Sequence, residues 1–180
     1  MMKHTNSRKP PILDSITDSD IMDLLHCPKE ITSHARKDMM IENASERNDM
    51  VVQSAKDYYT EPQIFKIFIR RSVFLPEDFS IGLIWLPKNN NRIILLRYNG
   101  RHGLNRSVPH QRVPHIHHLN AQDIQMEKYD PHHAAETDRY HSLEDALPLF
   151  LKECNIIDGE KDFPQLQEIS LFDTKGEDKP

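Results

Sequence analysis

Histidine, the side chain best suited to exchange protons near neutral pH, is concentrated in one part of this chain. Eight of the eleven histidines lie between residues 102 and 141, namely His102, His110, His115, His117, His118, His132, His133 and His141. The segment from Arg97 to Leu119 also contains guanidinium groups that could bind an anion. We therefore expect the functional centre of the protein in this segment, and interpret the pair His132–His133 as part of an exposed loop.

Three chemistries use such a group of side chains. In RNA cleavage, one imidazole removes the 2′-hydroxyl proton, another protonates the leaving oxygen, and an arginine stabilises the phosphorane. In a zinc site, the pattern His-x-His presents two ligands, His102 could supply a third, and an open position remains for catalysis. In a structural role, the histidines bond to loop backbone. The residue types alone leave all three interpretations open.

The spacing of the histidines predicts which of them share a face. If residues 113–119 form a strand, His115 and His117 point to one side, and His118 points to the other side with Ile116. The loop from residue 103 to 113 is long enough for this strand to pair back on the preceding one. We therefore expect His102, together with Arg97 or Arg101, to lie near His115 and His117.

The elements that would position these residues are mainly strands. Runs of β-branched and aromatic residues joined by short Pro- and Asn-rich turns predict antiparallel neighbours at residues 63–71, 79–86, 92–98 and 113–119. Residues 39–41 and 50–52 are interpreted as two short strands around a polar turn at 43–48, with a helix as the alternative for the second. Residues 166–172 are expected to form a last edge strand.

Two amphipathic segments predict helices. Thr17 is placed to cap the first helix, which should end near Cys27 before Pro28. Ser142 should cap the second helix, which extends to Cys154 and contains Pro148. The sequence thus predicts an α+β fold: an antiparallel sheet of about five to six strands, with an N-terminal and a C-terminal helix packed on one face. Residues 1–14 and 174–180 are predicted to be flexible tails around a single domain at 15–173.

The composition of the chain argues against several classes of protein. The formal net charge is −5, so the whole chain is not a polycation that binds nucleic acid, although a local basic patch remains compatible with this charge. The two cysteines lack metal-binding spacing, and with five glycines there is no Walker-type nucleotide loop. No secretory leader or apolar run of spanning length is visible. We expect a cytoplasmic protein without membrane contact.

The segment LLRYNGRHGLNRSVPHQRVPHIHHL resembles the signature of an uncharacterised bacterial domain family. That signature has an R-x-D/N strand end, a P-H turn, a polar loop and then P-H-x-H. Other segments agree in order: ITDSDIMDLLHCPK resembles the first helix, FKIFIRRS the Phe-rich strand, LPLFLKECNI the last helix, and QEISLF the C-terminal Q-x-x-L-F. The resemblance covers residues from about 16 to 172.

A shorter pattern, R-Y-D-N-x-x-H followed by P-H-H-x-H, is similar to that of TumE-type toxins of toxin–antitoxin pairs. This resemblance implies roles for Arg97, Asn99, His102, His115 and His117. We expect His102, His115 and His117 to be catalytic, and the substrate to be bound by Arg97, Tyr98, Asn99 and Arg101. The chain departs from the pattern at two positions. The acidic residue is missing, because Asn99 follows Tyr98 directly, and Arg101 replaces the proline before His102. If that Asp orients a histidine tautomer, this protein must use another group.

The leading hypothesis is therefore a bacterial toxin acting as a metal-independent endoribonuclease. RNA would be its substrate and a cognate antitoxin protein its partner, and no cofactor is required. One alternative is a non-enzymatic binding module of phage or mobile-element origin, in which the histidines are structural. Another is a zinc hydrolase with His102, His115 and His117 as the metal ligands.

Overall fold

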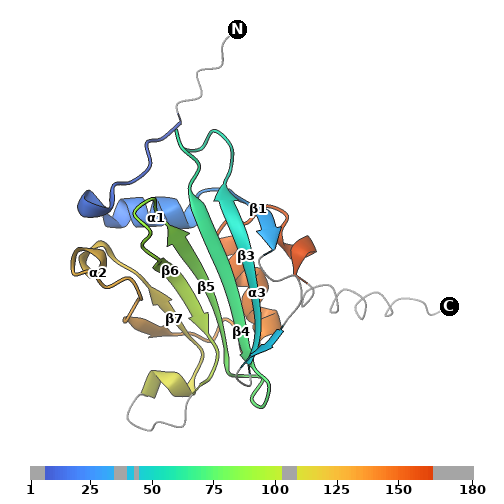
Figure 1. Cartoon of the computed structure of the whole chain (residues 1–180). Helices are drawn as coiled ribbons and strands as arrows, with labels where there is room; N and C mark the ends of the chain where they lie inside the picture. The colour runs from blue at the N-terminus through green and yellow to red at the C-terminus, as the bar shows by residue number, and fades with distance from the viewer. Residues whose placement is uncertain (1–6, 35–39, 43–44, 103–108, 164–180) are drawn as a thin grey trace, which may run out of the picture.

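The computed structural model describes residues 7–34, 40–42, 45–102 and 109–163 of the 180-residue chain (Figure 1). The helices are α1 (Asp18–His26), α2 (Ala121–Gln125) and α3 (Leu143–Glu153), with short 3-10 turns at Leu13–Ser15, Pro109–Arg112 and Gly159–Asp162. The strands are β1 (Lys29–His34), β2 (Met40–Glu42), β3 (Ser45–Ser54), β4 (Ile64–Ser72), β5 (Phe79–Leu86), β6 (Ile93–Asn99), β7 (His115–His118) and β8 (Ala134–Glu136).

The eight strands of the described chain form one antiparallel sheet, so the predicted α+β class is confirmed. Seven strands follow the order β1-β3-β4-β5-β6-β7-β8, and β2 pairs separately with β3. The expectation of five to six strands was therefore too low, because the polar strand β1 and the three-residue strand β8 lack a clear hydrophobic pattern. The segment around Met50 is a strand, not the alternative helix, and the predicted edge strand at 166–172 lies outside the described residues.

Both predicted helix caps are present. Thr17 Oγ1 accepts a hydrogen bond from the backbone N–H of Asp20, and the Asp20 carboxylate accepts one from the Thr17 N–H in return. At α3, Ser142 Oγ accepts from the N–H of Asp145 at 3.1 Å. No helix in the described residues is long and apolar enough to cross a membrane.

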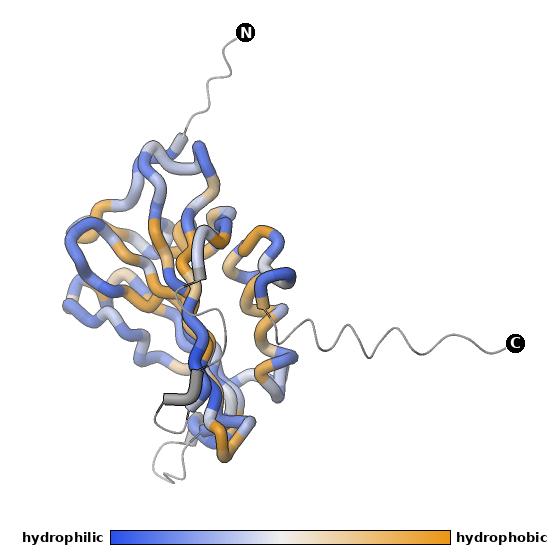
Figure 2. Tube along the Cα trace, turned by 45° about the vertical axis from the view of Figure 1, so that its right-hand side comes forward, coloured by the Kyte–Doolittle hydropathy of each residue, from blue (hydrophilic) through white to orange (hydrophobic). Residues whose placement is uncertain are grey.

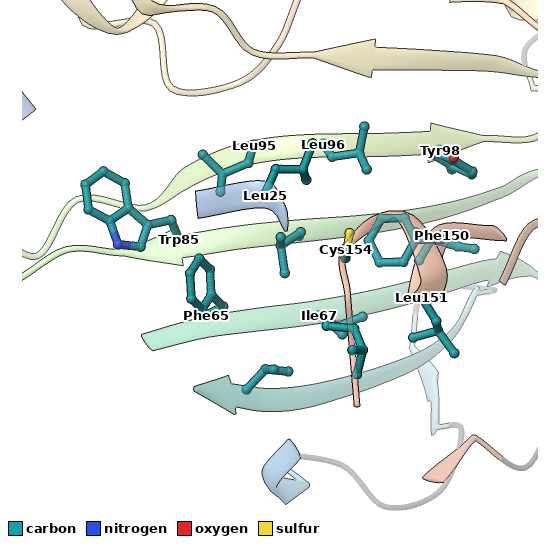
Figure 3. Close-up of a cluster of buried hydrophobic side chains, with 14 of the residues drawn as sticks. Leu25, Phe65, Ile67, Trp85, Leu95, Leu96, Tyr98, Phe150, Leu151 and Cys154 are labelled. Atoms are coloured by element: carbon teal, nitrogen blue, oxygen red, sulfur yellow. The ribbon is translucent and has the colours of Figure 1, made fainter. Parts of the chain in front are cut away.

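The strand register separates the residues of the sheet into two faces. One face carries the buried residues Phe65 and Ile67 of β4 and Trp85 of β5, which belong to the hydrophobic core together with Leu25 of α1 and Phe150 of α3 (Figure 3). Figure 2 shows that many hydrophobic segments gather in the middle of the molecule and that many of the outer loops are hydrophilic. The other face carries the polar residues of the candidate site.

A buried lysine joins the ends of the two long helices. Lys29 is fully buried at the start of β1, and its ammonium donates to the carbonyl oxygens of Leu25, Cys27 and Cys154 at 2.7, 2.8 and 3.0 Å. All three ammonium protons therefore have acceptors at the C-terminal ends of α1 and α3, where helix carbonyls have no partner within the helix. Burial lowers the pKa of Lys29.

Candidate active site

The ends of β6 and β7 hold the histidines in register with polar residues of the neighbouring strand. His115 lies opposite Asn99, and His117 lies opposite Arg97. Residues that oppose one another in a sheet project from the same face, so the predicted common face of His115 and His117 is confirmed. His118 pairs with Leu96 and lies on the opposite face, also as predicted.

The loop after β6 brings a third histidine to this face. The backbone N–H of His102 donates to the carbonyl oxygen of Gln111 at 2.8 Å, which joins the residue shortly after β6 to the segment before β7. The Nε2 atoms of His102 and His115 lie 3.2 Å apart, and the two rings are tilted by 47° with centroids 5.0 Å apart. The two imidazoles therefore share one hydrogen bond.

The surrounding groups determine which nitrogen donates in that bond. His115 Nδ1 lies 2.8 Å from the carbonyl oxygen of Val113, which can only accept, so Nδ1 carries the proton. Ser80 Oγ lies 2.7 Å from Asn99 Oδ1, which turns the Asn99 amide nitrogen towards His115 Nε2 at 3.1 Å. His115 Nε2 is thus an acceptor in a neutral ring, and His102 donates to it through Nε2–H. The lone pair of the neutral His102 ring is then on Nδ1.

Tyr140 hydrogen-bonds to the backbone of both Asn99 and His115. Its hydroxyl lies 3.1 Å from the carbonyl oxygen of Asn99 and 2.9 Å from that of His115, and it is buried. Burial raises the pKa of Tyr140, which keeps the hydroxyl protonated and able to donate. The Tyr140 ring stacks on Tyr98 with centroids 5.1 Å apart. Sequence reasoning missed this residue, because no local pattern links position 140 to positions 99 and 115.

Arg97 and His117 complete the polar face. Arg97 donates to the Asp130 carboxylate at 2.9 Å, while its Nε is buried and has no hydrogen-bond partner among the described residues. The ring of His117 meets that of His115 edge-on, with centroids 5.0 Å apart. His117 is buried, whereas Arg101 is exposed beyond the end of β6. The guanidinium of Arg97 thus lies on the same face as three imidazoles.

Tyr98 does not join this group, although it was predicted to bind the substrate. It alternates with Arg97 and Asn99 and therefore points to the core face, where its hydroxyl donates to Glu153. Glu153 also accepts from His118 at 3.3 Å and from Arg139 at 3.5 Å. Burial opposes ionisation of Glu153, but the bonds from His118 and Tyr98 and the nearby positive charges outweigh it and hold its pKa at about 2.

The remaining predicted candidates lie elsewhere. His132 and His133 are exposed in the segment between α2 and β8, in agreement with their interpretation as loop residues. The side chain of His110 lies outside the described residues. Within the part of the chain that the structure describes, no three or more His, Cys, Asp or Glu side chains are arranged to hold a metal ion.

Comparison of the chain with models of protein families, with curated proteins and with solved structures returned no match. The candidate function therefore depends on the site itself.

Proposed function

We propose that this protein is a metal-independent endoribonuclease and acts as the toxin of a bacterial toxin–antitoxin pair. The observation that carries the proposal is the hydrogen bond of 3.2 Å between His102 Nε2 and His115 Nε2. This bond makes Nε2 of a partly exposed histidine the donor, so that Nδ1 is the basic nitrogen of its neutral ring. A histidine oriented by a second group is the arrangement that general-base catalysis uses.

In the proposed reaction, Nδ1 of His102 takes the proton of an RNA 2′-hydroxyl. The 2′-oxygen attacks the adjacent phosphorus, the bond from phosphorus to the 5′-oxygen breaks, and His117 supplies the proton that this leaving oxygen needs. The guanidinium of Arg97, with Arg101 at the rim, stabilises the negative charge of the phosphorane. The products are a 2′,3′-cyclic phosphate and a 5′-hydroxyl, so no water or metal ion enters this step.

In this proposal, His115 has a different role from the catalytic one that the sequence resemblance implies. It is fully buried, and both of its ring nitrogens take part in hydrogen bonds. We infer that it is a positioning residue, which orients His102 in the way that a carboxylate orients the histidine of a catalytic triad. The Val113 carbonyl and the Asn99 amide hold His115 in turn. Through these contacts, His115 gives His102 the orientation that an acidic residue between Tyr98 and Asn99 would otherwise provide.

The position of the site on the sheet supports access for a polymer. We infer that α1 and α3 cover one face, because their buried residues belong to the same core cluster as Ile67 of β4 and Leu83 of β5. The site lies on the other face of the same strands. A substrate that approaches this face does not have to displace either helix.

Growth of a bacterial host tests the proposed function. Induced expression of the wild type should arrest growth, and His102→Ala and His117→Ala should restore it. The control is His132→Ala, at an exposed histidine outside the site, which should remain toxic. Equal growth of cells with the wild type and with an empty vector would contradict a toxin.

A second candidate is a binding module whose histidines are structural. It is favoured by the complete burial of His115 and by its bond to the backbone of Val113. On this interpretation, His115→Ala lowers the melting temperature, and His102→Ala changes neither growth nor RNA. The two candidates therefore differ in the effect of the His102 substitution.

A further inference from the structure

The face that carries the histidines continues across the sheet in two rows of opposed residues. In the first row, Arg97 of β6 lies opposite Gly82 of β5, Gly82 opposite Phe68 of β4, and Phe68 opposite Asp49 of β3. This row begins at His117 of β7. It therefore leads from the candidate active site to an aromatic ring three strands away.

The second row runs beside the first. It begins at His115 of β7 and passes through Asn99 of β6 and Ser80 of β5 to Arg70 of β4 and Arg47 of β3. Neighbouring strands lie about 4.8 Å apart, so Phe68 and Arg70 on β4 are roughly 14 Å from the histidines on β7. A ligand that extends across the sheet from the site would meet both side chains.

Phe68 does not belong to the hydrophobic core. Its neighbours in sequence, Ile67 and Ile69, are buried in the core on the opposite face, whereas Phe68 is only partly buried. The ring lies over Gly82, where an added Cβ would meet Phe68 Cε1 at 2.2 Å, so the close approach of the ring requires a glycine. The Phe68 ring therefore packs closely against Gly82 of the sheet while the residue remains only partly buried.

Cations surround this ring on the same face. The described strands β3 to β7 place four cationic side chains there, on Arg47, Lys66, Arg70 and Arg97, against the single carboxylate of Asp49. Asp49 contacts both Arg47 at 3.1 Å and Lys66 at 3.0 Å. Loop carboxylates pair with the other two, Asp78 with Arg70 and Asp130 with Arg97. Glu136 of β8 lies opposite His115 and Glu30 of β1 lies opposite Gln53 on the same face. The excess of cations is therefore confined to the strand residues of β3 to β6, although the whole chain carries −5.

We propose that this face binds single-stranded RNA, with one base stacked on Phe68 and the backbone following the cations towards His102. The inference rests on the proposed function and specifies its substrate as unpaired RNA. A partly exposed aromatic ring among arginine and lysine side chains is the usual composition of a surface that binds single strands, because every base can stack and every phosphate is anionic. A duplex would hide its bases from the ring.

The test measures the affinity of the full chain for a fluorescently labelled single-stranded RNA oligonucleotide by anisotropy, with His102→Ala present so that the RNA stays intact. In this background, Phe68→Ala and Phe68→Leu should each weaken binding about tenfold, and Phe68→Tyr should leave it unchanged. The leucine variant still covers Gly82 without an aromatic ring, and melting temperatures identify any variant that fails to fold. The matched control is Phe74→Ala, because Phe74 is 79% exposed at the turn after β4.

The outcomes separate the two proposals. If Phe68→Leu folds and binds RNA as tightly as its parent, the stacking surface is wrong, and the face is left to another partner such as an acidic protein. If RNA is cleaved by the wild type and Phe68→Leu cleaves equally well, the endoribonuclease remains and only the present inference fails. If the unsubstituted chain neither binds nor cleaves RNA, both proposals fail. Tighter binding of a duplex than of the single strand would also overturn the inference.

Discussion

The Nε2 atoms of His102 and His115 are 3.2 Å apart, and for a neutral His115 ring the neighbours of His115 give the hydrogen bond between them one direction. Nδ1 of His115 donates to a backbone carbonyl, so its Nε2 must accept. The donor is therefore His102. The Val113 carbonyl thus fixes the tautomer of His115, and His115 in turn makes Nδ1 the basic nitrogen of His102.

The Asn99 amide also favours this direction, and Asn99→Asp tests it. The amide nitrogen of Asn99 donates to His115 Nε2, whereas a carboxylate at the same position would attract a proton to that nitrogen. His115 could then no longer accept from His102. We expect RNA cleavage to fall by at least tenfold at neutral pH, with little loss of thermal stability. Asn89→Asp, in the exposed turn after β5, should cleave like the wild type; equal rates for both variants would contradict the assigned direction.

Tyr140→Phe tests how the two strand ends are held together. The substitution removes the hydroxyl that lies within 3.1 Å of the carbonyl oxygens of both Asn99 and His115. We expect the free energy of unfolding to fall by about 1 kcal/mol and cleavage to weaken without being abolished. Urea denaturation and RNA cleavage measure the two effects. Tyr129→Phe, at a partly buried tyrosine outside the site, is the control, and the same loss of cleavage in both variants would argue against a specific role for Tyr140.

Lys29→Met tests the buried ammonium that joins α1 to α3. Methionine fills a similar volume but leaves the carbonyls of Leu25, Cys27 and Cys154 without their donor. We expect a loss of about 3 kcal/mol or more in the free energy of unfolding. The exposed Lys56→Met should change it by less than about 0.5 kcal/mol. A chain with Lys29→Met that melts like the wild type would show that these bonds contribute little.

Glu153→Gln should alter the acid stability of the fold. Glu153 has a pKa of about 2 in the folded chain against an ordinary value of 4.5, so the folded state favours its ionised form. Its contribution is complete above about pH 5 and is lost as the pH falls towards 2. The wild type should therefore melt at a higher temperature than Glu153→Gln at pH 7, and the difference should shrink between pH 5 and pH 2.

The control for this pH dependence is Glu127→Gln, at an exposed carboxylate. Its melting temperature should follow that of the wild type at every pH. A difference between wild type and Glu153→Gln that stays constant from pH 7 to pH 2 would contradict the low pKa of Glu153.

Much of the sheet could be predicted from the sequence, because alternation with period two is a local property of each strand. The strand at Phe79–Leu86 was predicted with its observed bounds, and the same alternation placed His115 and His117 on one face. It should also have separated Tyr98 from Arg97 and Asn99, but all three were predicted to bind the substrate. Strand β8 was missed because three residues are too few to show a period.

The contacts that define the site could not be predicted in this way. The acceptor for His115 Nδ1 is a backbone carbonyl, which every residue has, so no residue type marks Val113 for this role. Tyr140 reaches the site from 25 and 41 positions away in sequence, through the packing of the segment before α3. The position of Phe68 in line with Arg97 and His117 depends on the register of four strands. Each of these is a tertiary relationship without a local signal.

The most direct test of the proposed function is the cleavage of a single-stranded RNA by the purified full chain in the presence of EDTA. We predict that the wild type cleaves it to products with 2′,3′-cyclic phosphate and 5′-hydroxyl ends, and that His102→Ala lowers the rate by a factor of about 100 or more. His132→Ala should cleave at the wild-type rate. Intact RNA with the wild type, or equal rates for the wild type and His102→Ala, would contradict the proposed role of the imidazole pair.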